Sequence, residues 1–126
     1  CSSDLYIAPG DFHMVVEVQA NQKVIRLTKA PPENFCRPAV DPMLRSLSRA
    51  YGRKVLTIIL TGMGQDGLRG GEVLVAGGGS LIAQDEKTSV VWGMPGAVAM
   101  AGLCTAVLPI DDIAPFLLRH VGRAPS

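Results

Sequence analysis

Residues 55–67 read VLTIILTGMGQDG, and this stretch decides the fold class. Its first six residues are apolar except for Thr57 and do not alternate, which is typical of a strand buried on both faces of a parallel sheet. Glycines follow at positions 62, 64 and 67, and they permit backbone conformations and close approaches that side chains would prevent. Because reactive groups in open α/β sheets gather at the carboxyl ends of strands, we expect a functional site in this loop.

The downstream sequence alternates between helical and strand patterns. We expect, in order, a helix through about Val75, a strand over residues 81–83, a short helix near residues 97–101, a strand over residues 105–108 and a last helix capped by Asp111 or Asp112. The apolar spacing of the last helix predicts that it buries Ile113, Phe116, Leu117 and Val121. This alternation predicts an α/β fold of three layers with a mostly parallel sheet.

The upstream sequence predicts an antiparallel extension. Short strands are expected over residues 5–8, 14–18 and 24–28, and an extended crossing loop is expected over residues 30–40. A helix then begins with Asp41 as its N-cap and Pro42 in its first position, and Gly52 ends it. The antiparallel strands add a hairpin to the parallel sheet.

Composition sets limits on the class of protein. The chain has 126 residues, 48% of them hydrophobic and 18% charged, which predicts one globular structural unit. A formal charge of +1 without a basic stripe argues against nucleic acid as a partner. The sequence contains no signal peptide pattern and no apolar run near the roughly 20 residues that span a bilayer, so we expect a cytoplasmic protein without membrane insertion. The three cysteines lack metal-ligand spacing, so no metal site is expected.

The glycine loop has three possible interpretations. Gly62-x-Gly64-x-x-Gly67 satisfies the dinucleotide fingerprint, with a strand before it and a helix after it. Against that interpretation, Asp66 would place a negative charge where a pyrophosphate needs the positive end of the helix. Asp66 can instead be a catalytic carboxylate, or only an N-cap of the helix that follows.

Several separate motifs together resemble one family. They are residues 6–14 (YIAPGDFHM), 37–41 (RPAVD), 60–67 (LTGMGQDG), 83–85 (AQD) and 93–95 (GMP). The motifs stand in the order and spacing found in the chemotaxis protein-glutamate methylesterases of the CheB family. The resemblance covers nearly the whole chain, and it identifies residues 1–126 as the C-terminal part of a CheB-type catalytic domain.

The resemblance implies a Ser-His-Asp hydrolase that removes methyl groups from glutamate methyl esters on chemoreceptors and can deamidate their glutamines. It implies no cofactor. By position, Asp66 corresponds to the triad aspartate, which would orient an imidazole and stabilise its charged form. Met63 corresponds to a residue whose backbone N–H helps to bind the oxyanion.

The serine and histidine segments of the family lie upstream of these motifs, and this sequence contains neither. His13 belongs to a different motif, so structural support near the site, or a hydrogen bond facing the pocket, is favoured over a role as the base. We therefore expect a chain cut from a longer protein that is inactive alone.

Three expectations follow for partners. The intact protein would act on methylated cytoplasmic domains of chemoreceptors and would carry a regulatory receiver domain. The isolated chain would self-associate through an uncovered sheet edge. If the natural gene itself lacked the upstream residues, a non-catalytic interaction module would be the remaining interpretation.

Overall fold

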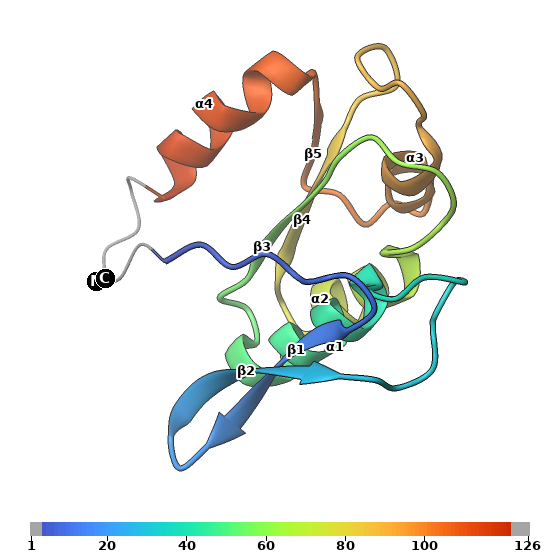
Figure 1. The fold of residues 1–126 in the computed structure, drawn as a ribbon. Coiled ribbons are helices and arrows are strands. Elements are labelled where there is room, and N and C mark those ends of the chain that lie inside the picture. Colours follow the sequence, from blue (N-terminus) through green and yellow to red (C-terminus); the bar gives the residue numbers. More distant parts are fainter. Residues whose placement is uncertain (1–3, 122–126) are drawn as a thin grey trace.

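The structure is a computed structural model, and it describes residues 4–121. Figure 1 shows the elements in chain order: β1 (His13–Gln19), β2 (Gln22–Thr28), α1 (Val40–Tyr51), β3 (Leu56–Ile59), α2 (Leu68–Ala76), β4 (Ser80–Gln84), α3 (Gly93–Met100), β5 (Ala106–Leu108) and α4 (Ile110–Val121). No helix within residues 4–121 is both long and apolar enough to cross a membrane.

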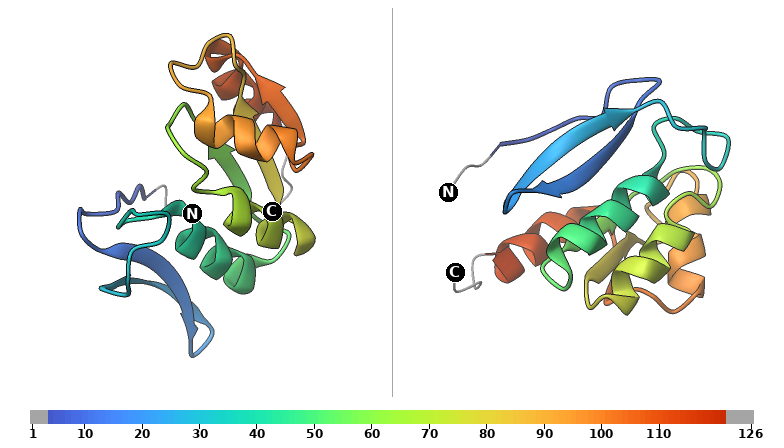
Figure 2. Two further views of the ribbon diagram at one scale, coloured as in Figure 1. Left: turned by 90° about the vertical axis from the view of Figure 1, so that its right-hand side faces the viewer. Right: turned by 90° about the horizontal axis from the view of Figure 1, so that it is seen from below.

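The centre of the fold is a three-stranded parallel sheet in the order β3-β4-β5. Helices α2 and α3 pack against each other and against β4, while α4 lies on the opposite side of the sheet (Figures 1 and 2). The buried core joins Ile59, Leu81, Ala83 and Val98 from β3, β4 and α3. The predicted three-layer α/β fold is confirmed.

The predicted antiparallel strands are β1 and β2, and they form a separate two-stranded sheet. Ala20 and Asn21 connect them with positive φ angles of 50° and 68°, as a tight hairpin turn requires. Helix α1 lies between this hairpin and α2 (Figure 2). The buried Ser46 hydroxyl accepts the Val16 N–H at 2.9 Å, which fastens the hairpin to α1.

The strand predicted over residues 5–8 is absent, so that prediction is wrong. This segment pairs with no strand among the described residues, and Leu5 and Ile7 are 86% and 84% exposed. Its apolar pattern is compatible with a strand, but a strand also needs a partner for its N–H and C=O groups.

Two helix starts also differ from the predictions. Helix α3 begins at Gly93 rather than near Ala97, and α4 begins at Ile110, so that Asp111 and Asp112 lie in its first turn instead of capping it. In α4 Ile113 is buried, and Phe116 and Leu117 are half-buried. The side chain of Val121 lies outside the described part of the chain.

Candidate active site

The loop of residues 60–67 connects the carboxyl end of β3 to α2. Gly62 donates its N–H to the Val91 carbonyl at 3.0 Å, and the Gly62 carbonyl accepts the Met94 N–H at 2.8 Å. The loop is therefore bonded to the residues that lead into α3. Gly67 at its end has a φ of 103°, a conformation that favours glycine.

Gly93 lies directly against this loop. A Cβ atom at Gly93 would come within 2.8 Å of the Gly64 nitrogen and 2.9 Å of the Gly62 oxygen. Because both are backbone atoms, a side chain there would displace the loop. Gly93 thus sets the position of the backbone around Met63.

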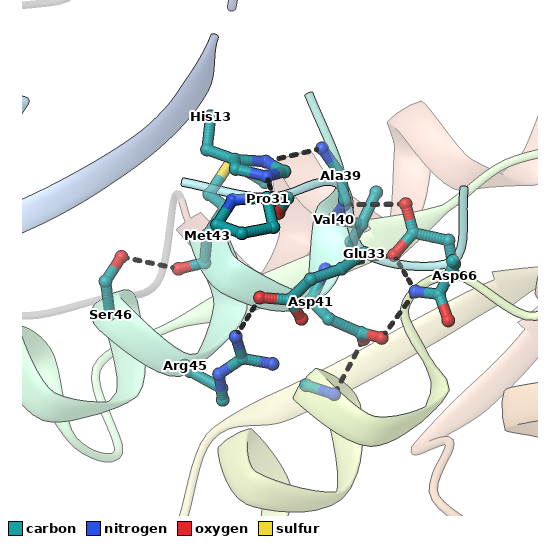
Figure 3. A network of polar contacts seen from close by, with 12 residues as sticks. His13, Pro31, Glu33, Ala39, Val40, Asp41, Met43, Arg45, Ser46 and Asp66 are labelled. Carbon is teal, nitrogen blue, oxygen red and sulfur yellow. Dashed lines mark hydrogen bonds and ion pairs between the residues drawn. The ribbon is translucent and has the colours of Figure 1, made fainter. Parts of the chain in front are cut away.

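The Asp66 carboxylate points back from the loop to the first turn of α1 (Figure 3). Its Oδ2 accepts the Val40 N–H at 2.7 Å, and its Oδ1 accepts the Asp41 N–H at 3.1 Å. Oδ1 also accepts a side-chain N–H of Asn34 at 2.9 Å. A helix N-terminus has unpaired N–H groups and a positive dipole end, so this carboxylate is bound where its charge is favoured.

Asp41 makes the reciprocal contacts. Its Oδ1 accepts the N–H groups of Gly67 at 3.0 Å and Gly70 at 2.7 Å, at the start of α2. The prediction that Asp41 is the N-cap of its own helix is wrong, because Ala39 is the N-cap of α1 and Asp41 lies within the first turn. The Asp41 carboxylate instead caps the neighbouring helix.

Asn34 joins the two carboxylates. Its amide nitrogen lies 2.8 Å from Asp41 Oδ2 and 2.9 Å from Asp66 Oδ1. The turn that carries it is fixed by an ion pair between the adjacent Glu33 and Arg45 of α1, at 2.6 Å. Asn34 and this role of Asp41 were not predicted from the sequence: the motif of residues 37–41 included Asp41, but no sequence pattern pointed to Asn34.

Exposure, rather than the number of donors, distinguishes the two carboxylates. A carboxylate has about four acceptor positions, and each of these two carboxylates accepts three donors, so each keeps about one position, on Oδ2. Asp41 is 1% exposed, whereas Asp66 is 7% exposed. Asp66 is therefore the carboxylate that a further donor can reach more easily.

Met63 lies in the middle of the loop, and the residue is 82% exposed. Its backbone N–H donates to no acceptor within residues 4–121. This N–H is therefore free to donate to a bound group, as an oxyanion site requires.

His13 is 1% exposed and both of its ring nitrogens are bonded (Figure 3). Nδ1 accepts the Ala39 N–H at 3.2 Å, so Nε2 carries the proton and donates to the Pro31 carbonyl at 3.0 Å. Neither nitrogen is available to a substrate. These bonds hold the segment next to Val40, which fits the predicted supporting role; that role stays a prediction.

The dinucleotide interpretation gains no support from the loop. A pyrophosphate would need the N–H groups at the start of α2, and those of Gly67 and Gly70 donate to Asp41. A phosphate there would also meet the charges of Asp41 and Asp66.

A well-formed groove lies away from this loop. It measures about 610 Å³ between the hairpin and α1, and its lining includes Tyr6, Val24, Met43, Leu47 and Tyr51. No residue of the 60–67 loop contributes to it, so the candidate active site rests on its hydrogen-bonding groups rather than on a cavity.

Known proteins are similar to this chain in sequence and in fold. The sequence profile described as CheB methylesterase matches residues 2–117. A protein-glutamate methylesterase/protein-glutamine glutaminase of Azospirillum brasilense is 67% identical over 94% of this chain, and another from Paramagnetospirillum magneticum is 66% identical over 94%. The chain spans only 30% and 31% of the lengths of these relatives.

The crystal structure of the Thermotoga maritima CheB methylesterase catalytic domain has the same fold. It superimposes with a TM-score of 0.88 at 41% identity, over 91% of this chain and 61% of that domain. The profile match and the identities agree with the shared fold, and the chain belongs to the CheB methylesterase family.

Proposed function

We propose that this chain is the C-terminal part of the catalytic domain of a protein-glutamate methylesterase/protein-glutamine glutaminase, and that Asp66 is its triad aspartate. The observation that carries the proposal is the Asp66 carboxylate, which three donors orient, which retains an acceptor position on Oδ2 and which is more exposed than Asp41. A carboxylate fixed in this way can accept an imidazole N–H, select the ring's tautomer and stabilise the imidazolium.

The nucleophilic serine and the histidine would come from the part of the enzyme that precedes this chain. The serine would attack the ester carbonyl of a glutamate methyl ester while the imidazole takes its proton and returns it to the departing methanol. Water would then release the carboxylate from the acyl-enzyme by the same route. The free N–H of Met63 would bind the oxyanion in both steps. Neither step needs a metal or a cofactor.

The relatives' names support a protein-glutamate methylesterase and protein-glutamine glutaminase activity for the intact enzyme. It would act on methylated cytoplasmic domains of chemoreceptors, under the control of a receiver domain, in the cytoplasm. Two of the reactive groups are absent from this sequence, so the chain alone would release no methanol from methylated receptor.

The test replaces Asp66 with asparagine in the intact catalytic domain that carries this sequence. Turnover, measured as methanol release, should fall by up to about four orders of magnitude while the circular dichroism spectrum stays unchanged. Asp112→Asn, at an exposed site on α4, is the control and should keep parental turnover. An Asp66→Asn enzyme that kept more than about a tenth of parental turnover would remove Asp66 from the triad.

The isolated chain is also proposed to self-associate. β3 lies at an edge of the sheet, and its outer N–H and C=O groups meet no strand among residues 4–121. Leu60 beside it is 47% exposed. Such an edge favours pairing with another chain. Light scattering at about 100 μM should give the mass of a dimer or larger, and a clean monomer mass would contradict the proposal.

A further inference from the structure

Asp66 and Asp41 each accept hydrogen bonds from the start of the helix that is associated with the other residue. Asp66 precedes α2 but binds the first N–H groups of α1, and Asp41 belongs to α1 but binds the first N–H groups of α2. We infer that Asp41 is a positioning residue for the catalytic carboxylate of Asp66. This inference rests on the proposed function, because it names the group that holds the proposed triad aspartate in place.

These reciprocal hydrogen bonds couple the position of each carboxylate to both helices. Any shift of α1 relative to α2 would move the Val40 N–H away from Asp66 and the Asp41 carboxylate away from Gly70 together. The helices are close here, since a Cβ atom at Gly70 would lie 2.9 Å from the Cα of Asp41. The junction therefore has little freedom to rearrange around a lost bond.

The Asn34 amide makes the link direct, because it donates to Asp41 Oδ2 and Asp66 Oδ1 at once. In an Asp41→Asn variant, one side-chain oxygen can still accept the N–H groups of α2. Its new NH₂ group would then face the NH₂ group of Asn34, and two donors cannot bond. Asn34 would turn away, and Asp66 would lose one of its three donors while both helices keep their shape.

The expected consequence is misplacement of Asp66 rather than unfolding. A displacement of about 1 Å in a reacting group can lower the rate by about 100-fold. In the intact catalytic domain, Asp41→Asn should lower kcat by about 10- to 100-fold and leave KM within about twofold.

A pH profile separates positioning from general structural damage. A well-placed carboxylate stabilises the imidazolium and so raises the pKa of the catalytic histidine. The acidic limb of kcat/KM against pH should therefore move to lower pH in Asp41→Asn, in the same direction as in Asp66→Asn. Loss of stability alone would reduce activity without moving that limb.

Two further variants complete the design. Asn34→Gly removes the bridging amide on a turn whose φ of 54° glycine tolerates, and it should lower kcat and move the acidic limb in the same direction. Ser46→Ala is the matched control: Ser46 is as buried in α1 as Asp41 but bonds the hairpin, so kcat should stay parental.

The outcomes are distinct. A kcat within about twofold of parental for both Asp41→Asn and Asn34→Gly would overturn the inference, as would an equal loss in Ser46→Ala. If Asp41→Asn fails to fold, Asn34→Gly decides alone. If Asp66→Asn itself keeps its turnover, the proposed function fails first, and Asp41 then has no catalytic group to position.

Discussion

Two groups of carboxylate contacts hold the segment of residues 29–41, and they differ most in burial. In the first group, Asp66 and Asp41 accept hydrogen bonds from backbone N–H groups in the interior. The Val40 nitrogen, for example, lies 2.7 Å from Asp66 Oδ2. In the second group, the Asp11 carboxylate accepts hydrogen bonds from the side chains of Lys29 at 2.7 Å and Arg37 at 2.6 Å, but the Asp11 side chain is 58% exposed. Bond length alone would rank the exposed contacts at least as high as the buried ones.

Solvent access separates them. When an exposed partner is removed, water takes its place, and salt screens the charges that remain. A buried N–H group that loses its acceptor keeps its full desolvation cost. The free energy of unfolding should therefore depend strongly on the buried junction and weakly on the exposed ion pairs.

The largest loss of stability is expected for Asp41→Ala. The substitution leaves the N–H groups of Gly67 and Gly70 without their acceptor, and hydrogen bonds to a charged group contribute about 1.5–3 kcal/mol each. We expect the free energy of unfolding to fall by about 3 kcal/mol or more, measured by urea unfolding. Asp112→Ala, exposed in the first turn of α4, should cost less than about 1 kcal/mol. A loss below about 1 kcal/mol for Asp41→Ala would mean that water reaches the junction.

A smaller loss is expected for Gly70→Ala, which tests how closely the helices cross. The new Cβ atom would lie 2.9 Å from Asp41 backbone atoms, which cannot move aside, so we expect a loss of about 1–3 kcal/mol. Gly71→Ala is the matched control, because its Cβ atom would lie 3.3 Å from the end of the Leu81 side chain, which can shift. If both variants unfolded at the same urea concentration, the crossing would be looser than the structure indicates.

Ser46→Ala comes next in size. It leaves the Val16 N–H without an acceptor at the contact between α1 and the hairpin, which should cost about 1 kcal/mol. Ser48→Ala, two residues further along α1, removes only an exposed 3.4 Å contact to the Val73 carbonyl. Thermal unfolding of the two variants should show a lower midpoint for Ser46→Ala, and equal midpoints would show that the hairpin contact contributes nothing.

Features that depend on local sequence patterns could be predicted, whereas features that depend on contacts between distant segments could not. The strand over residues 55–60 and the helix end at Gly52 depend on local patterns, and both are confirmed. The strand over residues 5–8 has a suitable local pattern too, yet it fails because a strand needs a partner that no local pattern supplies.

Asp41 shows the limit most clearly. An aspartate before proline predicts a carboxylate that binds the N–H groups at a helix start, and that chemistry is correct. The helix is the wrong one, because the choice between α1 and α2 depends on how the two helices cross. The contact of Asn34 with both carboxylates depends on the same crossing, so sequence spacing could not have predicted it.

The smallest effect is expected for Asp11→Asn, and its pH dependence identifies its source. Hydrogen bonds from Lys29 and Arg37 lower the pKa of Asp11 to about 2. A carboxylate whose pKa is lower in the folded state than in the unfolded state stabilises the fold above its unfolded pKa of 3.8, and that contribution is lost as the pH falls through about 2. Asparagine tolerates the Asp11 φ of 69°, so the substitution removes charge without straining the backbone.

At neutral pH and low salt the Asp11→Asn variant should unfold at a slightly lower urea concentration than the parent. The difference should shrink between pH 4 and pH 2 and also at high salt, because both conditions remove or screen the charge. A difference that stayed constant across pH and salt would show that Asp11 acts through its shape rather than its charge, and an effect as large as that of Asp41→Ala would mean that exposure does not separate the two groups of contacts.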